Sequence, residues 1–303
     1  MKKTVHKIVN KLPYIRGLYS QVQNLKKNAC YPPGHFYSPI VSVEDIKNRE
    51  SDIWKGVDED FINSIDLNTE EQKAFVELLS QYYSDLPFKR ENVKGLRYKF
   101  DNGLYSFTDG IILYAIIRHL KPNNIIEVGS GHSSALMLDV NQQFFDNNID
   151  LLFIEPFPDR LYKTISENDK TSTTILVKKV QEVDLSYFKK LQKGDILFVD
   201  STHVSKCGSD VNHILFNILP VLNAGVYIHF HDIFYPFEYP KEWVYKGMNW
   251  NEDYILRAFL MYNNDYKIKL FSHYLHKHHS SVFENMPLTY ENTGGNLWLE
   301  KVN

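Results

Sequence analysis

Cysteine is nearly absent from this chain of 303 residues, which contains only Cys30 and Cys207. The two lie far apart in the sequence, and neither belongs to a Cys-x-x-Cys motif. This usage excludes a disulfide framework and a cysteine-based zinc site. It is typical of a protein of the reducing cytoplasm, which is where we expect this one to act.

Long apolar runs are missing as well. No uninterrupted stretch approaches the roughly 20 residues that a membrane-spanning helix needs, and the N-terminus lacks the compact apolar block and cleavage site of a signal peptide. Since 43% of the residues are hydrophobic, the chain can still bury a large core. We therefore predict a soluble protein.

Acidic residues do not occur in residues 1–43, although the rest of the chain is acidic. Apolar residues recur there at helical spacing from Val5 to Leu25, and Pro13 is expected to break or kink the helix. The amphipathic segment 1–27 is expected to pack on its own domain; the alternative is a peripheral contact with anionic lipid at the inner face of the membrane, or with a partner. Nucleic-acid binding is not expected, because no basic stripe runs through the main part of the chain. The basic residues of the segment are Lys2, Lys3, Lys7, Lys11, Arg16, Lys26 and Lys27.

The main part of the chain alternates short apolar runs with helical stretches. Helices are predicted over 69–84, with Thr69 as N-cap, and over 107–122. The apolar runs resemble buried parallel strands joined by crossover helices. The predicted strands are 124–129, 150–155, 173–178, 195–200 and 225–232, with a C-terminal pair at 266–275 and 296–301.

Polar residues follow the predicted strands at the edge where open α/β sheets bind their ligands. The first run carries Glu127 and ends in Gly129 and Gly131, and the second ends in Glu155. Glycines allow a ligand to approach the backbone, and the acidic residue can accept both hydroxyls of a ribose. A dinucleotide fold would have a third glycine where this chain has Ser134, so adenosine binding is favoured over diphosphate binding.

Together, "EVGSG", the acidic end of the second strand, "VQEVD" and "DSTH" resemble the class I S-adenosylmethionine-dependent methyltransferases, over about residues 100–303. The resemblance implies a Rossmann-like α/β fold: a mostly parallel seven-stranded sheet with helices on both faces, a C-terminal antiparallel pair and an N-terminal helical extension. It implies two parts, residues 1–99 and 100–303. It also implies donor binding by Glu127, Gly129, Gly131 and Glu155, with Gln181 or Glu182 beside the adenine.

The acceptor side is expected at "DSTH" and at the "HD" of the next strand. In metal-dependent O-methyltransferases of this superfamily, the positions of Asp200 and Asp232 hold a magnesium ion and that of His203 carries a base. His231 stands where an oxygen ligand is expected, which widens the choice to Mg, Mn, Zn or Fe. The alternative is that these side chains make structural hydrogen bonds and hold no metal.

The segment 233–250 is long and aromatic, which is typical of a lid. Tyr235 and Trp243 are candidates for contact with an acceptor, with Tyr37 covering the same pocket; the alternative is that such aromatics seal the core. His229 is expected to be a hydrogen-bonded core histidine. The cluster His273, His276, His278 and His279 indicates an exposed turn or a metal site.

The sequence therefore predicts an O-methyltransferase that acts on a hydroxylated small molecule or glycan, with His203 as general base and with or without a metal. One alternative is an iron oxygenase that uses His203, His231 and Asp232 as a two-His, one-carboxylate site. Another is a non-catalytic protein that docks on a membrane through residues 1–27.

Overall fold

A computed structural model describes residues 13–303, and these form two compact units. The first comprises residues 13–55 together with Pro240–Asn249, and the second comprises Gly56–Tyr239 and Trp250–Asn303. Residues 56–99, which the sequence analysis assigned to the N-terminal part, thus lie in the same unit as the sheet.

The first unit is helical. Its helices are α2 (Pro13–Asn28), α3 (Val43–Asn48), α4 (Glu50–Ile53) and α12 (Lys241–Tyr245). The described part of helix α2 runs from Pro13 to Asn28. The predicted apolar positions Val5, Ile8, Val9 and Leu12 lie outside the described residues. Glu50 joins α4 to α12, since it accepts hydrogen bonds from Lys241 and from the Tyr245 hydroxyl (2.6 Å).

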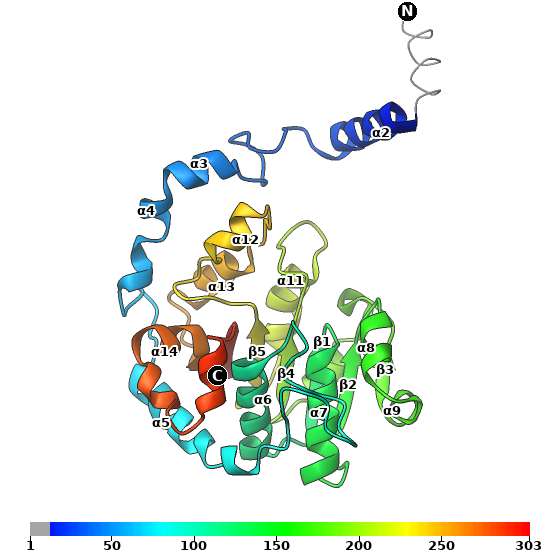
Figure 1. The fold of residues 1–303 in the computed structure, drawn as a ribbon, viewed down its shortest axis with the longest axis vertical. Coiled ribbons are helices and arrows are strands. Elements are labelled where there is room, and N and C mark those ends of the chain that lie inside the picture. The colour runs from blue at the N-terminus through cyan, green and yellow to red at the C-terminus, as the bar shows by residue number, and fades with distance from the viewer. Residues whose placement is uncertain (1–12) are drawn as a thin grey trace, which may run out of the picture. The chain divides into compact units, whose positions relative to one another are not determined.

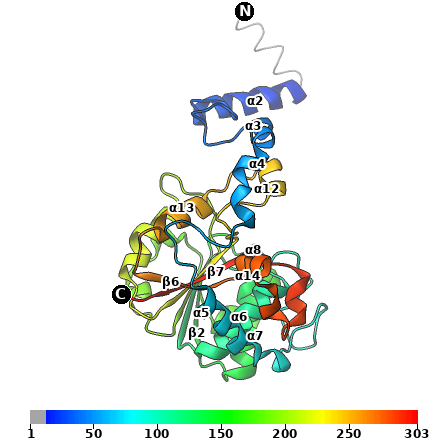
Figure 2. The same ribbon diagram turned by 90° about the vertical axis from the view of Figure 1, so that its left-hand side faces the viewer.

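The second unit contains a seven-stranded sheet in the order β3-β2-β1-β4-β5-β7-β6. Figure 1 labels β1 to β5, and Figure 2 labels β6 and β7. The first five strands run parallel, and β7 is antiparallel to both of its neighbours. This confirms the predicted Rossmann-like fold and its C-terminal antiparallel pair. The strands are β1 (Asn124–Val128), β2 (Asp150–Ile154), β3 (Thr174–Leu176), β4 (Ile196–Val199), β5 (Tyr227–His231), β6 (Tyr266–Phe271) and β7 (Asn296–Lys301).

Helices cover both faces of the sheet. Figure 2 shows α5, α6, α7 and α14 on one side and α13 on the other. Helix α6 is apolar on nearly every side because it is buried from Thr108 to Ile117, and α5 starts after Asn68 rather than being capped by Thr69. The main helices are α5 (Thr69–Ser80), α6 (Phe107–Leu120), α7 (His132–Phe144), α13 (Glu252–Leu260) and α14 (Ser272–His278). Shorter ones are α8 (Asp159–Thr164), α9 (Glu167–Ser172), α10 (Ser186–Lys189) and α11 (Asp210–His213).

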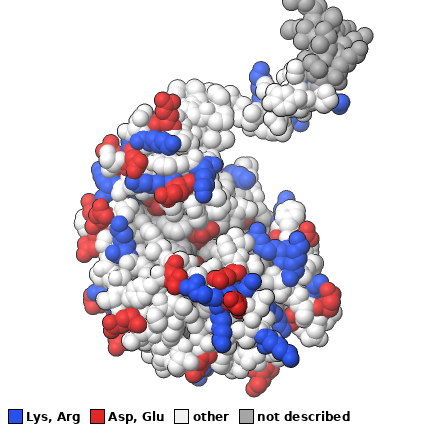
Figure 3. Space-filling model, in the orientation of Figure 1, with Lys and Arg blue, Asp and Glu red and all other residues white. Residues whose placement is uncertain are grey.

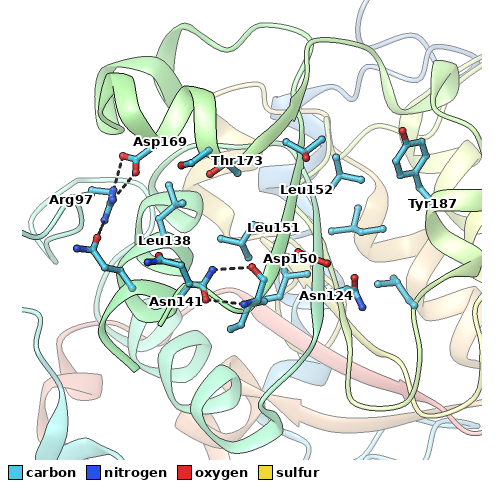
Figure 4. Close-up of a pocket in the computed structure, with 18 of the residues that line it drawn as sticks. Arg97, Asn124, Leu138, Asn141, Asp150, Leu151, Leu152, Asp169, Thr173 and Tyr187 are labelled. Carbon is cyan, nitrogen blue, oxygen red and sulfur yellow. Dashed lines mark hydrogen bonds and ion pairs between the residues drawn. The ribbon is translucent and has the colours of Figure 1, made fainter. Parts of the chain in front are cut away.

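A cavity of about 770 Å³ lies at the amino ends of β1, β2 and β3 (Figure 4). Beside it, Arg97 forms ion pairs with Asp139 of α7 (2.7 Å) and Asp169 of α9 (2.6 Å). These contacts fix the segment before α6 against two helices. The cavity is at the opposite edge of the sheet from the polar residues that follow β1, β4 and β5, and none of those residues lines it.

Candidate active site

The turn after β1 lies against the end of β4, its neighbour in the sheet. Gly129 has φ +82°, and a Cβ added to it would lie 1.8 Å from the carbonyl oxygen of Asp200. Only glycine fits this position, because any side chain would both strain the backbone and collide with the next strand. The close approach brings the glycine turn and Asp200 to one place at the carboxyl edge.

Glu127 anchors the start of helix α7. Its side chain is fully buried and accepts hydrogen bonds from the hydroxyls of Ser133 (2.6 Å) and Ser134. Burial raises the pKa of Glu127 to about 7, although the serine hydrogen bonds oppose the shift. Ser134 also accepts a hydrogen bond from the backbone of Gly131 (2.9 Å). The serine that replaces the third glycine therefore holds the turn together.

Glu155 closes the other side of the turn. One carboxylate oxygen accepts a hydrogen bond from the backbone N–H of Ser130 (3.0 Å) and the other from that of Phe157 (2.7 Å). The aliphatic part of Arg160 lies beside Gly131, since its Cδ would be 3.1 Å from an added Cβ. Arg160 is also close enough to Asp200 for its charge to lower the pKa of that carboxyl.

The predicted adenine residues lie in the turn Val180–Glu182 after β3. Gln181 donates a hydrogen bond to the carbonyl of Gly208 (2.9 Å), and Glu182 is exposed. The loop after β3 is thereby tied to the segment that precedes α11.

His203 is held by a carboxylate that the sequence analysis did not identify. Its Nδ1 donates to Oε2 of Glu252, the first residue of α13, at 2.9 Å. The Ser201 hydroxyl donates to the same oxygen (2.9 Å) and accepts from the backbone of His203 (2.9 Å). The ring of Trp250 lies 4.4 Å from the imidazole. These contacts fix the tautomer and the direction of the ring.

The Nε2 of His203 faces the two strand-end carboxylates. It lies 3.4 Å from Oδ1 of Asp200 and 3.8 Å from Oδ2 of Asp232. Burial opposes protonation, but hydrogen bonds to Asp200 and Glu252 raise the pKa of His203 well above its ordinary value. Burial alone would raise the pKa of Asp200, but the hydrogen bond from His203 and the charges of His203 and His231 outweigh burial and lower that pKa overall.

Two residues of this cluster adopt backbone conformations that are uncommon outside glycine. His203 has φ +58° and Asp232 has φ +56°. Such conformations cost free energy and concentrate at functional sites, where the surrounding contacts impose them. Here the carbonyl of His203 accepts hydrogen bonds from the backbones of Asn251 (3.0 Å) and Glu252 (3.2 Å), which hold the residue in place.

Comparison with known proteins identifies the family. The family of methyltransferase domains matches residues 126–233, which include the glycine turn, Glu155, Asp200, His203 and Asp232. An uncharacterized protein of Archaeoglobus fulgidus is 38% identical over 170 residues, which cover 55% of this chain and 76% of that protein. The chain belongs to the class I S-adenosylmethionine-dependent methyltransferases.

Three solved structures are similar to this chain. One is CmcI with magnesium and S-adenosylmethionine, at 17% identity, with 63% of this chain and 70% of that chain covered and a TM-score of 0.37. Another is PaMTH1 of Podospora anserina bound to S-adenosylhomocysteine, at 15% identity, 86% and 96% coverage and a TM-score of 0.41. The third is the O-methyltransferase TomG of Streptomyces achromogenes, at 12% identity, 77% and 90% coverage and a TM-score of 0.41.

The two histidines of β5 in this methyltransferase, His229 and His231, have different contacts. His231 has its Nε2 3.6 Å from Oδ1 of Asp232, and its Nδ1 is buried without a hydrogen-bond partner. His229 is in the core, as predicted, but it is not hydrogen-bonded: both ring nitrogens lack partners, and the ring stacks on Phe198 at 4.0 Å. Burial lowers the pKa of His229 well below its ordinary value, so the ring that stacks on Phe198 is neutral.

Metal binding by Asp200, His231 and Asp232 stays a prediction for the methyltransferase. The nitrogens of His203 and His231 face different oxygens of Asp232. Within residues 13–303, no three His, Cys, Asp or Glu side chains are grouped so that they could hold a metal ion.

The aromatic residues predicted to form a lid have different positions. Tyr235 is 1% exposed, and its hydroxyl donates to the backbone carbonyl of Glu59. This placement favours a role in the core, because the ring is closed off from solvent and its polar atom is used. Trp243 and the exposed Tyr37 belong to the first compact unit, and contact of either with an acceptor stays a prediction.

The C-terminal histidines do not form an exposed turn, so that interpretation was wrong. His273 and His276 lie in helix α14 and are half-buried. The Nδ1 of His273 accepts a hydrogen bond from the backbone of Tyr235 (3.0 Å), and His276 stacks on Phe283 at 4.1 Å. Burial lowers the pKa of both histidines to about 4.

Proposed function

We propose that this methyltransferase transfers the methyl group of S-adenosylmethionine to a hydroxyl oxygen, and that His203 accepts the hydroxyl proton. The observation that carries the proposal is the contact between His203 Nδ1 and Glu252 (2.9 Å), which leaves Nε2 as the proton acceptor. A hydroxyl needs such a base because its pKa is far above 7. Nitrogen and sulfur acceptors have less need of one.

The donor binds in this proposal at the turn around Gly129 and Gly131, with its ribose hydroxyls on Glu155. The two backbone N–H groups that hold the Glu155 carboxylate keep it at the carboxyl edge of β2, and Gln181 or Glu182 lies beside the adenine. When bound, S-adenosylmethionine supplies a methyl group on a sulfonium: the acceptor oxygen bonds to that carbon as the S–C bond breaks, and S-adenosylhomocysteine leaves.

The proton of the acceptor hydroxyl moves to Nε2 of His203. Glu252 keeps the hydrogen on Nδ1, and Asp200 and Asp232 stabilise the imidazolium that results. Because the same contacts raise the pKa of His203, the ring accepts a proton only after losing the one that it carries near neutral pH. We therefore expect the rate to increase with pH.

The acceptor in this proposal is a hydroxylated small molecule or glycan. Tyr37 and Trp243 are the aromatic side chains proposed to contact it. Because no three side chains within residues 13–303 are grouped to hold a metal ion, a divalent metal at Asp200, His231 and Asp232 would require these side chains to move closer together, and the proposed base does not depend on it. A metal would supply further acidification of the hydroxyl. The reaction is proposed to take place in the cytoplasm.

The test measures transfer of labelled methyl from S-adenosylmethionine to a panel of phenols, catechols and sugars, with the product identified by mass spectrometry. His203→Ala should lower kcat by roughly 100-fold or more while S-adenosylhomocysteine still binds. His119→Ala serves as the matched control, because His119 lies at the far end of α6 against Phe75 and Tyr82. A methyl ether that forms equally well with His203→Ala would refute the role of the base, and exclusive N- or S-methyl products would refute O-methylation.

Neither alternative from the sequence is needed. An iron oxygenase would not explain the match to methyltransferase domains over residues 126–233, and a purely non-catalytic protein would not explain it either. Membrane docking is compatible with catalysis.

A further inference from the structure

One face of helix α2 is apolar and exposed. Ile15, Leu18, Val22 and Leu25 follow one another at helical spacing, and their exposed fractions are 42%, 45%, 45% and 53%. None of the 16 residues of α2 is buried. A helix that packs on its own protein usually buries such a stripe, so this one is built for another surface.

The charge of α2 indicates which surface that is. The helix contains Arg16, Lys26 and Lys27 and no acidic residue, and no Asp or Glu precedes Glu44 in the sequence. On the face shown in Figure 3, blue basic side chains and no red acidic ones lie over this helix. An anionic bilayer attracts such a helix and would repel carboxylates, whereas a protein groove offers no general reason to exclude them.

The length and composition favour binding along the bilayer surface. A helix of this length measures about 24 Å, and its apolar stripe has polar Ser20 and Lys27 on the opposite side. Within residues 13–303, no helix has both the length and the apolar content required to cross a bilayer. Helices with one apolar and one basic face lie in the headgroup region with the apolar side chains inserted.

We propose that residues 13–28 anchor this methyltransferase to anionic lipid bilayers, with Ile15, Leu18, Val22 and Leu25 inserted and Arg16, Lys26 and Lys27 on the headgroups. The anchor does not depend on the proposed O-methylation, because α2 supplies no residue to the candidate active site. It would keep the enzyme at a surface where lipid-linked or membrane-associated hydroxyl acceptors are concentrated.

The test uses the full chain and two kinds of vesicle, phosphatidylcholine alone and phosphatidylcholine mixed with phosphatidylglycerol. We expect the wild-type protein to sediment with the mixed vesicles at about 0.1 M salt and much less at about 1 M. Val22→Glu should lower binding about tenfold, and Ser20→Glu less than about threefold. The two substitutions add the same charge at positions roughly 160° apart around the helix, so they separate insertion from net charge.

Binding of S-adenosylhomocysteine, measured by calorimetry, shows that each variant is folded. Equal losses for Val22→Glu and Ser20→Glu would overturn the proposal, as would equal binding to both kinds of vesicle or no binding to either. A concentration-dependent dimer that Val22→Glu abolishes, without vesicle binding by the wild type, would also overturn it and would assign the face to a second copy of the chain.

Discussion

The Nδ1 atom of His203 and the Oε2 atom of Glu252 lie 2.9 Å apart, although 49 residues separate them in the sequence. The Glu252 side chain is 2% exposed and also accepts the Ser201 hydroxyl. Glu252 is therefore a positioning residue, which orients the imidazole without reaching the reacting atoms.

Glu252→Gln is expected to lower kcat roughly 10- to 100-fold and to leave KM for S-adenosylmethionine nearly unchanged. The amide can present its NH2 group to Nδ1, which would favour the wrong tautomer and remove the charge that stabilises the imidazolium. Steady-state kinetics at a saturating concentration of acceptor measures kcat and the KM for S-adenosylmethionine separately. Glu252→Asp, which keeps the charge, should recover part of the rate. A Glu252→Gln enzyme with wild-type kcat would contradict the positioning role of Glu252.

Gly129→Ala is expected to prevent donor binding and to lower the free energy of unfolding by about 3 kcal/mol or more. The added methyl would meet the carbonyl oxygen of Asp200, and the backbone has φ +82°. Gly95→Ala is a matched control, because Gly95 has φ +88° but open space around it; it should cost only about 1 kcal/mol. Urea unfolding and calorimetry with S-adenosylhomocysteine give the two readouts. Similar effects of both substitutions would mean that the close approach to β4 is unimportant.

Arg97→Ala is expected to lower the free energy of unfolding by about 3–5 kcal/mol, because it leaves two buried carboxylates without their positively charged partner. The side chains of Asp139 and Asp169 are 0% and 4% exposed, and Arg97 itself is 18% exposed. Figure 4 shows Arg97 pointing at Asp169 beside the cavity. The control is Arg90→Ala, whose ion pair with Glu291 is 46% and 43% exposed and should contribute under about 1 kcal/mol. Equal unfolding midpoints for the two variants would contradict this difference.

The apolar runs predicted every strand end to within four residues, because strands buried on both faces leave a continuous signal. β1, β2 and β4 show it clearly, since nearly all their residues are buried. The residues that follow these strands were predicted for the same reason: topology alone brings the ends of neighbouring parallel strands together.

Glu252 could not be predicted in the same way. It begins a helix as "NEDY", and acidic residues are common in the first turn of any helix. Its contact with His203 depends on how the chain from β5 returns to the sheet, which no local pattern records. Tyr235 shows a related limit, because an aromatic residue in a long loop has the same local signature whether it contacts a ligand or fills the core.

Glu127→Gln is expected to change how stability depends on pH. Burial raises the pKa of Glu127 from 4.5 to about 7 in the folded protein. A carboxyl with a raised pKa binds its proton more tightly when folded, so its contribution is complete below about pH 4.5 and is lost as pH rises through about 7. The loss is on the order of 3 kcal/mol, and glutamine, which does not ionise, avoids it.

The variant should therefore gain stability relative to the wild type between pH 5 and pH 8, as measured by urea unfolding at both values. Glu77→Gln is the control, since Glu77 is exposed on α5. Its substitution should change the free energy of unfolding by the same amount at pH 5 and at pH 8. Binding of S-adenosylhomocysteine by Glu127→Gln separates two roles for this carboxyl. Unchanged affinity would assign it to the start of α7, where Ser133 and Ser134 donate to it, and weakened affinity in a stable variant would assign it to the donor. If the stability difference between variant and wild type is the same at both pH values, the buried carboxyl is already compensated by contacts beyond the two serines.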